Sequence, residues 1–107
     1  MPNQIGVRDL KAMLDRGDPV YLVDVRQPWE HERAALPNSV LVPLDRLADL
    51  HDEIVPPAGA LVVAYCHHGI RSLNAAAMLE RIGHRVVSLA GGIDRWSIEI
   101  DPQIPRY

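Results

Sequence analysis

Short apolar runs alternate along the chain with segments in which apolar residues recur at helical spacing. The runs are rich in branched residues, which is typical of strands in a sheet that is covered on both faces. We predict strands at 20–25, 39–42, 60–65 and 86–89, and helices at 7–14, 28–33, 44–50, 72–81 and about 93–97. Because strands alternate with helices, the pattern predicts an α/β fold with a parallel sheet between layers of helices.

Glycine and proline residues mark the expected ends of these elements. Gly17 is expected to end the first helix, and Gly83 to close the helix at 72–81 as a left-handed cap. The prolines after position 101 prevent the last helix from continuing. A chain of 107 residues has room for one hydrophobic core. We therefore predict a single domain over 1–107, with a core at about 5–98 and a tail at 99–107 that packs on the domain or meets a partner.

Composition narrows the classes of partner. The chain is 48% hydrophobic and carries a formal net charge of −3, so neither nucleic acid nor an anionic membrane surface is an expected partner. No apolar run approaches the ~20 residues of a membrane span. A single cysteine forms no internal disulfide, so a reducing cytoplasm is the expected compartment. The oligomeric state stays open, with a monomer favoured.

The single cysteine, Cys66, lies between the predicted strand at 60–65 and the predicted helix at 72–81. A thiol in this place faces unpaired backbone N–H groups and the positive end of a helix dipole, and both favour the nucleophilic thiolate. We expect the sulfur at the mouth of the loop, only partly desolvated. The segment 24–26 also follows a strand, and ligands of parallel sheets bind beyond the carboxyl ends of strands. The two segments are therefore expected to meet at one site.

Four segments in this order resemble the signatures of the rhodanese-like (sulfurtransferase) domains. They are Leu22-Val23-Asp24-Val25-Arg26 with Glu30, Ala34-Ala35-Leu36-Pro37-Asn38-Ser39, the loop Tyr65 to Ser72, and Gly83 to Trp96. Two departures stand out: Ala34-Ala35 replaces the family's usual Gly-His, and Asn38 replaces a glycine in a turn that favours left-handed backbone. The resemblance implies a single-domain member, a small three-layer sandwich around a central parallel sheet of four to five strands.

The resemblance also implies a reaction. Cys66 would take a sulfane sulfur from thiosulfate or a persulfide donor, hold it as a persulfide, and pass it to cyanide or a thiol. The partners are then a small-molecule donor and a thiophilic acceptor, including a thiol protein. The residues expected to bind the substrate are His67, His68, Gly69, Ile70, Arg71 and Ser72.

Each part of this loop has an expected role under the resemblance. Backbone N–H groups from 67 to 72 would face the anionic sulfur, and Gly69 would allow the angles that such a cradle needs. Arg71 offers a planar fork to the sulfonate oxygens of thiosulfate. Ser72 can cap the helix and donate its hydroxyl to the sulfur.

Asp24 and Arg26 are expected to support the site structurally, as an ion-paired or hydrogen-bonded brace at the strand end. We expect no metal, because one cysteine and two histidines in a loop without an acidic residue make a thin ligand set. We expect no cofactor either, since Gly91-Gly92 lacks the pattern of a dinucleotide or phosphate loop.

Two other functions stay open. A docking or regulatory module on the same fold would be non-enzymatic, but family members of that kind commonly lack the cysteine. An arsenate reductase or phosphatase would use a Cys-x5-Arg loop, whereas Cys66 and Arg71 are separated by four residues. The shorter loop accompanies sulfur transfer in the family comparison.

Overall fold

A five-stranded parallel sheet forms the centre of the computed structural model, which describes residues 3–107. The strands are β1 (Asn3–Ile5), β2 (Val20–Asp24), β3 (Val40–Leu41), β4 (Leu61–Tyr65) and β5 (Val86–Leu89). Their order is β1-β5-β4-β2-β3, and every neighbouring pair is parallel. The predicted α/β fold with a covered parallel sheet is confirmed, and the sheet has five strands.

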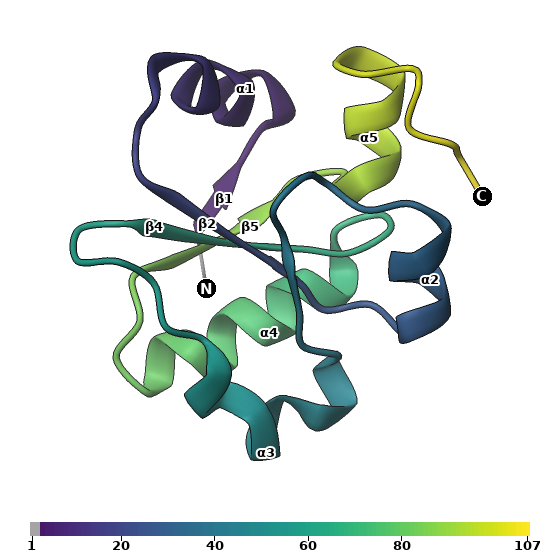
Figure 1. The fold of residues 1–107 in the computed structure, drawn as a ribbon. Helices are drawn as coiled ribbons and strands as arrows, with labels where there is room; N and C mark the ends of the chain where they lie inside the picture. Colours follow the sequence, from purple (N-terminus) through teal and green to yellow (C-terminus); the bar gives the residue numbers. More distant parts are fainter. Residues whose placement is uncertain (1–2) are drawn as a thin grey trace.

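The helices lie in two layers, one on each face of the sheet (Figure 1). They are α1 (Val7–Arg16), α2 (Pro28–Arg33), α3 (Leu47–Leu50), α4 (Ile70–Arg81) and α5 (Gly92–Glu99). In Figure 1, α1 and α5 lie above the sheet while α3 and α4 lie below it. No helix in the described part of the chain has the length and apolar character needed to cross a membrane.

Each face of the sheet has its own hydrophobic core, because alternate residues of a strand point to opposite faces. Toward α4, Val23 and Val62 pack with Ala75, Ala76 and Leu79. Toward α1 and α5, a second set packs together: Val7, Leu10, Leu22, Val63, Leu89, Ile93 and Trp96. The central strand β4 is buried along its whole length. Its unbroken apolar run is the sequence signature of burial on both faces.

The structure corrects three details of the sequence analysis. β1 was not predicted, because a short exposed edge strand with two polar residues shows no apolar pattern. The segment 44–50 is a 3₁₀ turn (Leu44–Arg46) followed by the short helix α3, not one helix. The helix predicted at 72–81 begins earlier, at Ile70, directly after the left-handed Gly69. Gly83 has a φ of 99°, so the predicted left-handed position at the end of α4 is confirmed.

The register of the strands positions the candidate site. Asp24 is paired with Tyr65 across β2 and β4, so the residues that follow them leave the sheet side by side. Arg26 and Cys66 lie in these two exits. The edge formed by the carboxyl ends of the strands therefore brings together the two segments that the sequence marked.

Candidate active site

The sulfur of Cys66 lies under the loop that joins β4 to α4. The backbone N–H of Gly69 donates to Sγ at 3.1 Å, and that of Ser72 at 3.4 Å. The Ser72 hydroxyl lies 3.4 Å from Sγ and 2.7 Å from the hydroxyl of Ser88. Two backbone N–H groups thus converge on the sulfur, an arrangement that stabilises a thiolate or an anionic persulfide.

The start of α5 holds the loop in this conformation. The N–H of Ile93 donates to the carbonyl of Cys66 at 2.9 Å, and the N–H of Asp94 to the carbonyl of His67 at 3.1 Å. Because α5 binds these two carbonyls on the outer side of the loop, the N–H groups of Gly69 and Ser72 can face the sulfur on the inner side. Gly92 packs directly against the same carbonyls, and a Cβ there would overlap both oxygens. The Gly91-Gly92 turn therefore supports the sulfur loop.

Two expectations about the loop are wrong in detail. Cys66 is 1% exposed rather than partly desolvated at a mouth, because the loop folds over it and the residue belongs to the core on the α4 face. Ser72 does not cap the helix, since the capping position is Gly69, and its hydroxyl turns inward to Cys66 and Ser88 instead.

The guanidinium of Arg71 forms a two-pronged ion pair with Glu30. The distances are 2.6 Å from Nη1 to Oε1 and 2.9 Å from Nη2 to Oε2. This bond, with further donors from Tyr107 and Gln27, lowers the pKa of Glu30 to about 2. Bonding to Glu30 in turn raises the pKa of Arg71, and the nearby Cys66 adds to that effect.

Sequence reasoning gave Glu30 no role in the site. The capping box with Gln27 at the start of α2 fixes its backbone, and only the fold shows that its carboxylate reaches Arg71. Arg71 is thus already paired with Glu30 before a sulfur donor binds.

Asp24 and Arg26 form a fully buried ion pair at the end of β2. Arg26 Nε lies 2.8 Å from Asp24 Oδ1, and Nη2 lies 2.7 Å from Oδ2. Nη2 also donates to the carbonyl of Ala34, and Nη1 donates to the hydroxyl of Tyr107 at 2.7 Å. Burial works to lower the pKa of Arg26, but the bonds to Asp24 and Tyr107 outweigh it and raise that pKa above its ordinary value. All of these contacts brace segments that flank the sulfur loop.

The hydroxyl of Tyr65 extends this brace to the turn that departs from the family pattern. It lies 3.2 Å from Asp24 Oδ2 and 2.8 Å from Ser39 Oγ, and it accepts from the N–H of Leu36 at 3.1 Å. Burial raises the pKa of Tyr65 to about 12, so the hydroxyl keeps its proton. Asn38 in the same turn has a φ of 63°, the left-handed conformation for which asparagine was the expected substitute.

The remaining loop side chains face outward or sideways. His67 is stacked between His68 and Tyr107, with ring centroids 3.9 Å apart in each pair. Burial lowers the pKa of His67, which favours the neutral imidazole. Ile70 is 74% exposed. Among residues 3–107, no group of three or more histidine, cysteine or acidic side chains is arranged to hold a metal ion.

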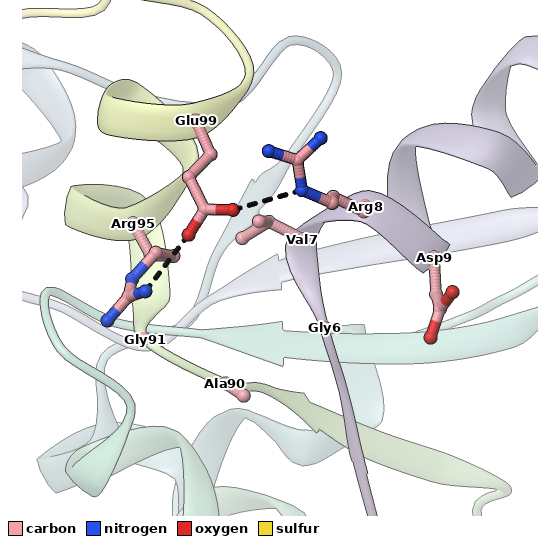
Figure 2. A pocket seen from close by; sticks show the side chains of 8 residues that line it. All are labelled: Gly6, Val7, Arg8, Asp9, Ala90, Gly91, Arg95 and Glu99. Carbon is pink, nitrogen blue, oxygen red and sulfur yellow. Dashed lines mark hydrogen bonds and ion pairs between the residues drawn. The ribbon is translucent and has the colours of Figure 1, made fainter.

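A cavity of about 520 Å³ lies beside this region, between the starts of α1 and α5 (Figure 2). Glu99 stands between Arg8 and Arg95 there and pairs with both, at 3.2 and 2.9 Å. The cavity shares Gly91 with the turn under the loop, but Cys66 does not line it. The candidate active site is therefore defined by Cys66 and the N–H groups that contact its sulfur, not by this cavity.

Fold and loop together define a small α/β domain with a single cysteine at the carboxyl edge of its sheet, and comparison with known proteins shows its family. The model of the Rhodanese-like domain family matches residues 6–99, so the chain belongs to that family. A sulfurtransferase of Allochromatium vinosum is 36% identical over 98 residues, which cover 91% of this chain and 90% of that protein. A rhodanese-like domain protein from Staphylococcus aureus has a structure that matches with a TM-score of 0.82 and 28% identity, covering 98% of each chain.

A longer relative contains the domain as one part. An adenylyltransferase and sulfurtransferase of Ogataea parapolymorpha is 36% identical over 88 residues, and the match covers 81% of this chain but 22% of that protein. Relatives of both sizes are thus named sulfurtransferases, which supports a transferase role for this domain.

Replacing Asp24 with alanine tests the buried brace. The change leaves the Arg26 charge desolvated without its carboxylate, which costs about 3–5 kcal/mol of unfolding free energy. Asp15 is the matched control, because it pairs with Lys11 at an exposed surface site. Its replacement with alanine should cost less than about 1 kcal/mol in urea denaturation. Equal losses in the two variants would contradict the brace.

Replacing Gly92 with alanine tests the support beneath the loop. Gly59 also has positive φ, but a Cβ there meets nothing within 4 Å, so Gly59→Ala reports the backbone cost alone. We expect Gly92→Ala to lose about 1–3 kcal/mol more than Gly59→Ala, the scale of an overpacked site. Denaturant titration of both variants measures the difference. A Gly92→Ala protein as stable as Gly59→Ala would show that the contact is not tight.

Proposed function

We propose that this domain is a sulfurtransferase that carries a sulfane sulfur as a persulfide on Cys66. The observation that carries the proposal is the convergence of the Gly69 and Ser72 N–H groups on Sγ. Backbone donors aimed at one sulfur are suited to a group that is anionic both before and after it accepts a second sulfur. The names of the sulfurtransferase relatives support the same reaction class.

The reaction has two displacements. The Cys66 thiolate attacks the outer sulfur of thiosulfate, a new S–S bond forms, and the bond to the sulfonate sulfur breaks with its electron pair leaving on sulfite. Cyanide or a thiolate then attacks the terminal sulfur of the persulfide. This step yields thiocyanate or a new persulfide and restores the Cys66 thiolate, so no external oxidant is needed.

The depth of the sulfur favours small donors. Cys66 is buried, so a donor must enter under the loop with a narrow end, as the outer sulfur of thiosulfate does. The sulfonate would then stay near the loop surface, where Arg71 lies half-buried against Glu30. We propose that Arg71 contributes its charge to the donor while Glu30 keeps the guanidinium in place.

A thiol protein remains a fitting acceptor, because the persulfide can be attacked by any thiolate that reaches the loop. The longer relative that contains this domain is consistent with transfer between domains or proteins. The cysteine, with two backbone N–H groups directed at its sulfur, argues against a purely non-enzymatic module. Against phosphate or arsenate chemistry stands the loop of four residues between Cys66 and Arg71.

Thiosulfate alone should leave one extra sulfur on the protein. Intact-protein mass spectrometry should show this gain, and cyanide should reverse it with release of thiocyanate. Cys66→Ser should show neither the gain nor thiocyanate production. If the parent protein stayed unmodified with thiosulfate and with persulfide donors alike, the sulfurtransferase proposal would fail.

Arg71 should matter more for an anionic donor than for an uncharged one. Arg71→Ala should lower kcat/KM for thiosulfate. The expected fall corresponds to a loss of about 1.5–3 kcal/mol of transition-state stabilisation, the scale of a hydrogen bond to a charged group. Arg71→Lys keeps the charge without the planar fork and should recover part of the loss. A donor without the sulfonate group, either uncharged or a persulfide, should lose less in both variants. Losses of the same size with every donor would mean that the Arg71–Glu30 pair only holds the loop.

A further inference from the structure

The tail after α5 returns to the active site, although it lies outside the residues matched by the family. That match ends at residue 99. Beyond it, the Ser97 hydroxyl donates to the carbonyl of Ile104, and Arg106 pairs with Asp94 at 2.8 Å. Ile104 and Tyr107 pack against the core on the α1 and α5 face. Of the two alternatives for the tail, packing on the domain or contact with a partner, the structure therefore shows packing on the domain.

The hydroxyl of Tyr107 joins the two arginine pairs of the site. It accepts from Arg26 Nη1 at 2.7 Å and donates to Glu30 Oε2 at 2.7 Å. Arg26 is fully buried, so its Nη1 group needs an acceptor inside the protein. Glu30 holds Arg71, so one tail hydroxyl lies between the brace at β2 and the arginine of the sulfur loop.

The ring of Tyr107 covers the loop from the side. It stacks on His67 with an angle of 8° between the planes, and its centroid lies 5.9 Å from that of the Trp29 ring, which is nearly perpendicular to it. The Nε2 atom of His67 is buried without a hydrogen-bond partner among the described residues. The ring and the hydroxyl of one residue therefore contact two different parts of the site.

We propose that Tyr107 is a positioning residue for sulfur transfer, which holds His67 of the loop through its ring and the Glu30–Arg71 pair through its hydroxyl. The proposal rests on the proposed function for its catalytic readout, and it concerns a residue outside the family match. A residue that only stabilised the domain would not need to contact His67 of the loop or the Glu30–Arg71 pair. Because the two contacts use different atoms, the hydroxyl contact can be removed while the ring contact is kept.

Three variants separate the contacts. Tyr107→Phe removes the hydroxyl and keeps the ring, Tyr107→Ala removes both, and Gln103→Ala is the matched control on an exposed position of the same tail. The first readout is the titration of His67 by NMR, assigned with His67→Gln. The second is the rate at which thiosulfate forms the persulfide, followed by mass and measured below the unfolding temperature of each variant.

The titration reports on the ring contact. The charged or titratable groups around the imidazole are His68, Asp94, Glu30, Arg71 and Tyr107. Burial is the main cause of the low pKa of His67, so uncovering the ring in Tyr107→Ala should raise that pKa toward its ordinary value. Tyr107→Phe and Gln103→Ala should titrate like the parent. An unchanged His67 titration in Tyr107→Ala would overturn the seating of the tail on the loop.

The rate reports on the hydroxyl contact. Tyr107→Phe removes the bonds of the hydroxyl to Arg26 and Glu30, and losing the bond to Glu30 should slow persulfide formation about 3- to 10-fold, while Gln103→Ala keeps the parent rate. A parent rate in Tyr107→Phe would overturn the positioning role. If the parent protein itself formed no persulfide, the proposed function would fail, whereas the His67 titration would still decide whether the tail holds the loop.

Discussion

The buried charge of Arg26 is the constraint on which the site's architecture depends. A guanidinium with no contact to water must find protein acceptors for its donors, since each unpaired one would carry the cost of its lost hydration. Here the acceptors come from Asp24, the carbonyl of Ala34 and the hydroxyl of Tyr107. They belong to a strand end, the segment after α2 and the tail. Satisfying one charge therefore brings the segment after α2 and the distant tail to the end of β2, at the edge of the sheet where Cys66 lies.

The sulfur loop depends on a second kind of constraint, the direction of its peptide groups. The start of α5 binds the carbonyls of Cys66 and His67 from outside, and the N–H groups of Gly69 and Ser72 face the sulfur inside. Such a cradle is already formed before a substrate binds, so little reorganisation is needed when charge develops on the sulfur. The fold supplies both sides of this arrangement, because β4 leads into the loop and β5 leads into α5.

Local pattern was enough to predict the strands β2 to β5 and the place of Cys66, because buried parallel strands are apolar throughout and a strand-to-helix turn is short. It missed β1, whose exposed edge position demands no apolar residues. It also gave Glu30 and Tyr107 no role in the site. Their contacts join residues 41 and 77 positions apart, and no spacing rule reaches over such distances. The burial of Cys66 escaped prediction for a related reason, since it depends on how far the loop folds over its own sulfur.

The division of labour within the loop has a consequence for how such domains diversify. The groups that face the sulfur are mostly peptide N–H groups, which every residue except proline retains, although the left-handed backbone at Gly69 favours glycine there. The side chain of Ile70, by contrast, is mostly exposed to solvent. A change at Ile70 can therefore alter which molecules approach the loop without removing a donor at the sulfur. A new specificity is therefore accessible through single substitutions, with the reactive centre inherited intact.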